Sequence, residues 1–315
     1  MKSRGQCKNG RRGGDMDNDK ARALMAALVS TRPAASGNLE QGRQLREGEL
    51  VRLSPRFALP GNIFATLEPH EKKWVQAAAV GAGAPRAVLC GRSAARLLGM
   101  WVVGPAEEKV ELMLPTGGLP PKSKWPPGVA YYRDGFLADT FAELYGLRLT
   151  TYIRTALDIA TRHGFVEGLV AADWLLSSGV ATRNQLKAEV DRMRGRKGVG
   201  TAREVVRHAV DTSESPYESY ARALLIQAGF DVRSQVRFGR YRVDLMVGRV
   251  IIEVDGSVKY DGATYGPLDE ELRVERAREN YLQDLGYLVR RVSPRELLEH
   301  PQFFIERIKR AVVAS

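Results

Sequence analysis

Apolar and polar positions alternate along two short segments near the C-terminus of this 315-residue chain. Residues 240–247 and 250–255 carry an apolar side chain at nearly every second position, which is typical of half-buried β-strands. Gly248 and Arg249, which lie between them, predict a two-residue turn. We therefore expect an antiparallel hairpin in this part of the chain.

The segment in front of this hairpin predicts a helix. Ser215 is expected to be the N-cap, Pro216 to lie in the first turn and Glu218 to occupy the third helical position. Apolar residues at helical spacing form one face, and Gly229 marks the end. A glutamate at this place is by default a capping residue, so spacing alone does not make Glu218 a site residue.

The N-terminal part predicts a different arrangement. Residues 20–29 and the basic residues 38–48 predict short helices, and residues 49–61 predict a second hairpin. This order is typical of a winged helix-turn-helix, in which a helix enters the major groove of DNA and the wing arginines, Arg52 and Arg56, contact phosphates. A small hairpin that caps a helix without binding nucleic acid is the alternative.

The chain between these regions mixes strand and helix patterns and shows no catalytic motif. Residues 88–103 predict a strand that leads into a helix, residues 110–114 a strand, and residues 150–210 mostly helices. We therefore predict a multidomain protein of the α/β and α+β classes. The expected parts are a flexible basic arm (1–19), a winged helix-turn-helix (20–66), a mixed and helical region (67–210) and a C-terminal α/β domain (211–315).

The register of the C-terminal hairpin predicts a cluster of acids. If the strands pair directly across the turn, Asp244 faces Glu253 and Arg242 faces Asp255, and the three acids project from one side. Two directly opposed carboxylates repel each other, and no cation is evident for Asp244 and Glu253. A divalent ion such as Mg²⁺ or Mn²⁺ would resolve this conflict and activate water for phosphodiester hydrolysis. An acidic face turned to solvent is the alternative.

Charge and cysteine content narrow the class of protein. The chain has 48 Lys and Arg against 37 Asp and Glu, a net charge of +11, which favours a polyanion such as nucleic acid. A merely basic protein is the alternative. Two cysteines are too few for a disulfide framework, and no apolar run is long enough for a membrane helix. We expect a cytoplasmic protein with no membrane contact; the sequence leaves its oligomeric state open.

Two motifs stand out in the N-terminal half. They are Arg46-Glu-Gly-Glu-Leu-Val-Arg52, followed by Phe57-Ala-Leu-Pro-Gly61, and Gly91-Arg-Ser-Ala-Ala-Arg-Leu-Leu-Gly99. This half resembles the AbiEi-like antitoxins and transcriptional regulators. The resemblance implies binding of double-stranded DNA and transcriptional control, and leaves room for a toxin or another partner from a phage-defence locus.

The C-terminal part carries its own ordered landmarks. They are Glu218, Gln235, Tyr241-Arg-Val-Asp244, Ile251-Ile-Glu-Val-Asp-Gly256 and the segment from Arg278 to Arg290. Together they resemble the very-short-patch-repair-endonuclease-like domain of the PD-(D/E)xK, or restriction-endonuclease-like, group. The resemblance implies an α/β core with a central mixed sheet, dependence on Mg²⁺ and hydrolysis of phosphodiester bonds.

The resemblance also implies roles for single residues. Asp244 and Glu253 match the two metal-binding acids, and Glu218 matches the helix acid that joins the metal site or activates water. Gln235 matches a residue that lines the cleft. Asp255 stands where the broader group has its lysine, although an acid there is usual in this subfamily.

Basic residues near these acids are further candidates. Lys259 stands where the subfamily more often has histidine; it would replace the missing lysine, and a phosphate contact or a surface position is the alternative. Arg242 and Arg278 are candidates for contact with a DNA backbone. For the arginines of residues 273–278, ion pairs with glutamates of the same helix are the plain alternative.

Two classes of function are consistent with these features. The first is a Mg²⁺-dependent DNA endonuclease or nickase whose N-terminal half targets DNA, in a phage-defence or toxin–antitoxin setting. The second is a non-catalytic DNA-binding transcriptional regulator with an inactive nuclease-like module. The presence of Asp244, Glu253 and Glu218 favours the enzyme, and the missing lysine favours the regulator.

Overall fold

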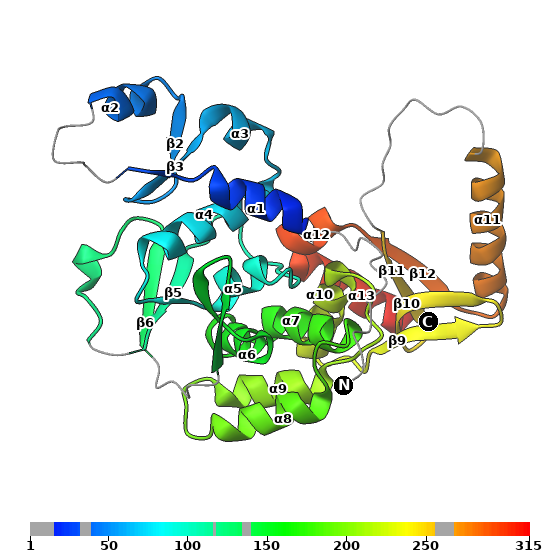
Figure 1. Cartoon of the computed structure of the whole chain (residues 1–315). Coiled ribbons are helices and arrows are strands. Elements are labelled where there is room, and N and C mark those ends of the chain that lie inside the picture. Colours follow the sequence, from blue (N-terminus) through cyan, green and yellow to red (C-terminus); the bar gives the residue numbers. More distant parts are fainter. Residues whose placement is uncertain (1–15, 32–38, 116–117, 134–139, 256–267) are drawn as a thin grey trace, which may run out of the picture. The chain divides into compact units, whose positions relative to one another are not determined.

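The computed structural model describes residues 16–31, 39–115, 118–133, 140–255 and 268–315. Contacts along the chain divide it into two compact units, Met1–Arg162 and His163–Ser315 (Figure 1). The described strands form three sheets, and helices accompany each of them, so the protein is of the mixed α/β kind. None of the described helices combines the length and the apolar character that crossing a membrane requires.

The first unit begins with a three-stranded sheet in the order β1-β3-β2. Its elements are α1 (Asn18–Ala26), β1 (Val29–Ser30), α2 (Leu39–Arg46), β2 (Leu50–Arg52), β3 (Phe57–Pro60) and α3 (Gly61–Thr66). The predicted hairpin is confirmed, with Val51 opposite Leu59. The helix expected over residues 20–29 ends earlier, because Val29 pairs with Ala58 as part of β1. The described residues place one helix between β1 and β2, and the winged helix-turn-helix stays a prediction.

A five-stranded sheet in the order β6-β5-β4-β8-β7 forms the rest of this unit. Its elements are α4 (Pro69–Gly83), β4 (Val88–Leu89), α5 (Gly91–Leu97), β5 (Val110–Leu114), η1 (Lys122–Lys124), β6 (Val129–Arg133), β7 (Phe141–Leu144), β8 (Leu147–Thr150) and α6 (Tyr152–His163). The predicted strand before α5 and the predicted strand β5 are confirmed. Trp74 and Ala78 of α4 share a buried core with Leu89 and Leu149 of the sheet.

The second unit starts with four helices. They are α7 (Phe165–Ser177), α8 (Arg183–Arg192), α9 (Val199–His208) and α10 (Pro216–Gln227). A buried ion pair joins α7 to α10, because Nη2 of Arg222 lies 2.7 Å and 2.9 Å from the two carboxylate oxygens of Asp173. The N–H of Val210 also donates to Asp173, at 2.8 Å. Helices on both sides of the predicted domain boundary at residue 211 are therefore held together.

The C-terminal sheet is mixed, as predicted, with the order β12-β11-β10-β9. Its elements are β9 (Arg233–Phe238), β10 (Tyr241–Val247), β11 (Val250–Val254), α11 (Leu268–Asp284), β12 (Leu288–Val292), α12 (Pro294–Glu299) and α13 (Pro301–Ala314). Strands β11 and β12 pair in parallel, and the other neighbours are antiparallel. The predicted hairpin register is confirmed for Val247 opposite Val250 and Leu245 opposite Ile252.

Apolar residues of this sheet alternate between two covered faces. Leu245 and Ile252 pack in a core with residues of α10 and α13, including Phe304. Met246 and Ile251 pack with Leu282 of α11. Figure 1 shows α11 on one side of the sheet and α10 and α13 on the other. The polar residues of β10 and β11 are thus set on a framework that is fixed from both faces.

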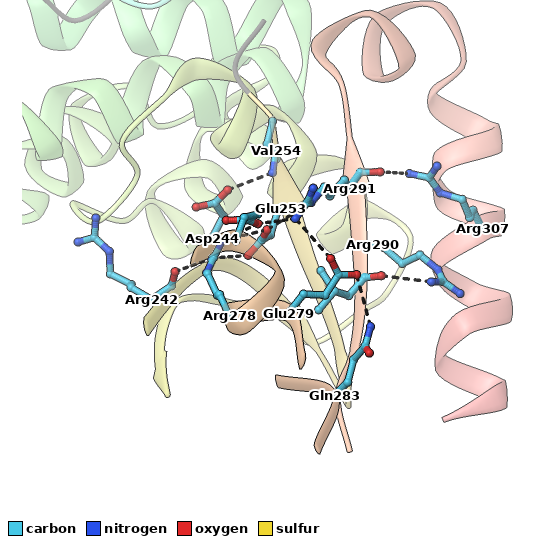
Figure 2. Close-up of polar contacts among 12 residues, drawn as sticks. Arg242, Asp244, Glu253, Val254, Arg278, Glu279, Gln283, Arg290, Arg291 and Arg307 are labelled. Atoms are coloured by element: carbon cyan, nitrogen blue, oxygen red, sulfur yellow. Dashed lines mark hydrogen bonds and ion pairs between the residues drawn. The ribbon is translucent and has the colours of Figure 1, made fainter. Parts of the chain in front are cut away.

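The outer side of β12 is occupied by arginine side chains. The guanidinium of Arg290 donates to the carbonyl oxygen of Val289 at 3.1 Å, and that of Arg307 in α13 donates to the carbonyl oxygen of Arg291 at 2.9 Å (Figure 2). On the inner side, the N–H of Leu288 donates to the carbonyl oxygen of Arg249 at 2.9 Å. Strand β12 is the edge strand of the described sheet. The outward carbonyl oxygens of Val289 and Arg291 at this edge are already bonded to guanidinium groups.

Candidate active site

Glu218 lies in the first turn of α10, where its backbone and its side chain have different roles. Its N–H donates to Oγ of Ser215 at 3.1 Å, which confirms the predicted N-cap. Its carboxylate accepts from the N–H of Glu214 at 3.1 Å and from Nε2 of Gln235 at 3.0 Å. The side chain is buried, with Glu218 only 7% exposed. Helix α10 thus presents an acid toward strand β9.

Gln235 has an unusual backbone conformation within β9. Its φ is 54°, in the left-handed region that residues other than glycine seldom adopt. The pairs on either side, Val236 with Val243 and Ser234 with Leu245, place Gln235 beside Asp244 in the ladder. Its Oε1 is buried and has no hydrogen-bond partner among the described residues. Strained backbone together with an unsatisfied buried acceptor indicates a binding position.

Asp244 of β10 is half-buried and bonded to the end of the next strand. Its Oδ2 accepts from the N–H of Val254 at 3.0 Å (Figure 2). The paired residues of β10 and β11 end at Leu245 and Ile252, one position short of the expected pair of Asp244 with Glu253. The two acids nevertheless interact electrostatically.

Glu253 of β11 forms an ion pair with a basic residue that its position in the hairpin did not indicate. The guanidinium of Arg278 in α11 contacts both of its oxygens, Nη2 at Oε1 and Nη1 at 3.2 Å from Oε2 (Figure 2). Nη2 of Arg278 also donates to the carbonyl oxygen of Arg242 at 3.0 Å. Arg291 of β12 lies farther away, with Nε at 3.8 Å from Oε2. Glu253 therefore has a cationic partner, although none was evident for it from the register of the hairpin.

The other predicted site residues are placed differently. The guanidinium of Arg242 pairs with Glu214, a residue not predicted for the site, rather than with Asp255. Strand β11 ends at Val254, and the N–H of Asp255 donates to the carbonyl oxygen of Val292 at 3.1 Å. Lys259 lies outside the described residues.

The wing arginines of the first unit also differ from each other. Arg52 at the end of β2 is exposed. Arg56 donates from Nη1 to the carbonyl oxygen of Gly83, the last residue of α4, at 2.9 Å. Of these two arginines, Arg52 is the one whose side chain has no structural role among the contacts of the described residues.

Burial raises the pKa values of the three acids. It is the largest cause for Glu218, Asp244 and Glu253 alike. The negative charge of Asp244 raises the pKa of the other two further. Arg278 opposes the rise at Glu253, and the N–H of Val254 opposes it at Asp244. These carboxylates form an electrostatically strained group that a further cation would relieve.

The residues fit a hard divalent cation. Mg²⁺ binds carboxylate and amide oxygens and commonly takes one or two protein carboxylates together with water and phosphate. Asp244 and Glu253 supply the carboxylates, and the unpaired Oε1 of Gln235 is a third oxygen donor. Within the part of the chain that the structure describes, no three His, Cys, Asp or Glu side chains form a ready metal site. The fit therefore rests on two carboxylates and an amide.

Comparison with known proteins gives a family for the C-terminal part. Residues 217–312 match the family REase_MTES_1575, and this range includes Glu218, Gln235, Asp244, Glu253 and Arg278. No curated protein matches the chain. The crystal structure of the RV2827C protein from Mycobacterium tuberculosis is similar at 17% identity and a TM-score of 0.37, over 68% of this chain and 83% of that one. Residues 217–312 are therefore a restriction endonuclease-like domain of the REase_MTES_1575 family.

Proposed function

We propose that the C-terminal domain is a divalent-metal-dependent nuclease that cuts double-stranded DNA, as an endonuclease or a nickase. One observation carries the proposal: Glu218, Asp244 and Glu253 come from different elements and form one largely buried acidic group, next to the Gln235 oxygen that has no partner among the described residues. The family match over residues 217–312 supports it.

Each acid has a task in this reaction. Asp244 and Glu253, with Oε1 of Gln235, would hold the divalent ion, which would polarise the phosphate and lower the pKa of a bound water. Glu218, with a raised pKa, accepts the proton of the attacking water. The water oxygen bonds to phosphorus, the bond from phosphorus to the leaving strand oxygen breaks, and that oxygen takes up a proton from a solvent water. Assisting roles for Asp255 and Lys259 in the reaction belong to the same proposal.

We assign the targeting of DNA to the first unit, in line with the AbiEi-like resemblance of that half. The hairpin of β2 and β3 would act as the wing, with Arg52 on a phosphate. The finer kinship with very-short-patch-repair endonucleases, the Mg²⁺ or Mn²⁺ requirement and a partner from a toxin–antitoxin or phage-defence locus belong to the same proposal.

A plasmid assay tests the nuclease. Full-length protein with Mg²⁺ or Mn²⁺ should nick supercoiled plasmid, and Asp244→Asn and Glu253→Gln should each abolish nicking. Asp231→Asn is the matched control, because Asp231 is an exposed acid of the same domain and should leave nicking unchanged. A wild-type protein as silent as its variants under these conditions contradicts the proposal.

A non-catalytic DNA-binding regulator is the second candidate. The observation in its favour is that Arg278 already neutralises Glu253, so the acidic group has a counter-ion without metal. If the plasmid stays intact while a promoter fragment is retarded in a gel by the same preparation, the regulator is the better description.

A further inference from the structure

Among the described residues, Arg278 is the basic residue bonded most closely to the acidic group. It contacts both oxygens of Glu253 and the carbonyl oxygen of Arg242. Glu253 is 6% exposed, so its charge depends on neighbouring groups more than on water. A two-pronged guanidinium contact is the strongest counter-ion that a buried carboxylate obtains from a side chain.

The same contact obstructs a divalent ion. A metal ion coordinates a carboxylate through its oxygens, and both oxygens of Glu253 face the guanidinium of Arg278. Two cations on one carboxylate repel each other at short range. Binding of metal to Glu253 and the full contact with Arg278 are therefore competing states.

Arg278 has a second partner within reach. Its Nη1 lies 3.5 Å from Oε1 of Glu275, which is one turn away on α11 and 39% exposed. The side chain of Arg278 is 21% exposed, so its guanidinium reaches solvent as well as the acids. A released guanidinium would stay beside the site, where it is suited to a phosphate oxygen.

We propose that Arg278 is a phosphate-binding residue that becomes available only when a divalent ion is bound. It neutralises Glu253 when no metal is bound, and it turns to a phosphate of the DNA strand when a divalent ion takes the Glu253 oxygens. This inference rests on the proposed nuclease function and adds a coupling to it: metal binding frees the charge that holds the substrate.

Metal titration of the full-length protein without DNA tests the first half. Free Mn²⁺ is measured by electron paramagnetic resonance for wild type, Arg278→Met, Arg278→Lys and Arg276→Met. Removing the competing guanidinium in Arg278→Met should tighten the Mn²⁺ dissociation constant about tenfold, within the usual range of coupling between linked sites. Arg278→Lys should tighten it less, because an ammonium remains but does not span both oxygens. Arg276→Met should leave it unchanged, since Arg276 is exposed on the same helix.

Affinity for a short labelled DNA duplex, measured by fluorescence anisotropy, tests the second half. Ca²⁺ is used, since it also prefers carboxylate oxygens. The ion should raise the DNA affinity of wild type and of Arg276→Met, and this gain should be lost in Arg278→Met. A melting curve checks that each variant is folded, and Arg278→Lys serves if Arg278→Met does not fold.

The outcomes separate the inference from the nuclease proposal. If Mn²⁺ binds wild type but binds neither Arg278→Met nor Arg278→Lys more tightly, Arg278 does not compete with the metal ion. This result would overturn the inference and would still support the metal site. A full DNA gain in Arg278→Met overturns the phosphate contact. Failure of wild type and both Arg278 variants to bind Mn²⁺ overturns the inference together with the metal site.

Discussion

Gln235 donates a hydrogen bond of 3.0 Å to Glu218 from a backbone whose φ is 54°. The contact and the conformation together predict that two small substitutions of Gln235 differ in their effect on stability. Gln235→Ala loses the bond and keeps the unfavourable φ, whereas Gln235→Gly loses the bond but tolerates the φ. The glycine variant should be more stable than the alanine variant by about 1 kcal/mol, measured by urea unfolding. Equal stabilities would contradict the backbone assignment. Both variants should nick DNA more slowly than wild type.

The raised pKa values of the acidic group predict how stability depends on pH. The folded state holds protons on Glu218, Asp244 and Glu253 more tightly than the unfolded chain, so the free energy of unfolding falls as pH rises from about 4, where ordinary carboxyls titrate. Asp244→Asn should flatten this dependence and raise the melting temperature near neutral pH. Asp231→Asn, the exposed control, should do neither.

Binding of a divalent metal ion should offset the loss of stability that the acidic group causes near neutral pH. A cation that binds only the folded protein stabilises it in proportion to the logarithm of its concentration over the dissociation constant. Mg²⁺ or Mn²⁺ should therefore raise the melting temperature of wild type near neutral pH, and should have no such effect on the double variant Asp244→Asn, Glu253→Gln. Calorimetry with a chelator as the reference measures this shift. A wild-type melt that ignores the metal contradicts the metal site.

The pair Asp173 and Arg222 predicts a large effect on stability without any role in chemistry. Both side chains are buried, and removal of one partner leaves an unbalanced charge, which costs about 3–5 kcal/mol. Arg222→Met should lower the free energy of unfolding by that amount, and Asp173→Leu together with Arg222→Met should recover most of it. Denaturation in urea measures both. A single variant within about 1 kcal/mol of wild type would show that the pair is not what joins α7 to α10.

The two wing arginines should behave differently in DNA binding. If Arg52 contacts a phosphate, Arg52→Ala weakens binding for all sequences and lowers the slope of affinity against salt by about one. Arg56 is bonded to the end of α4, so Arg56→Ala should lower thermal stability more than it changes that slope. Anisotropy titrations at several salt concentrations, with a melting curve for each variant, distinguish the two.

Local patterns in the sequence predicted the elements around the site well. The cap at Ser215, the alternation in β10 and β11 and the two-residue turn depend on neighbours in the chain, and the structure confirms them. The mixed character of the C-terminal sheet followed from the family resemblance. Strands β6, β7, β8 and β9 were missed, because short strands carry too little alternation to be recognised from the sequence.

The ion-pair partners of the site residues could not be predicted from the spacing of residues in the sequence. Arg278 reaches Glu253 from a helix that begins beyond the hairpin, and Glu214 takes Arg242 from the segment before α10. Such pairs depend on how elements pack. The left-handed backbone of Gln235 had no signal either, because glutamine is not a residue that marks such positions.

The two arginine-capped carbonyls on the outer side of β12 have a consequence for self-association. A strand from another molecule would have to displace the guanidinium groups of Arg290 and Arg307 before it paired with Val289 and Arg291. Their positive charge would also repel the same edge of a second copy. The β12 edge of this sheet is thus protected against pairing with the same edge of a second copy.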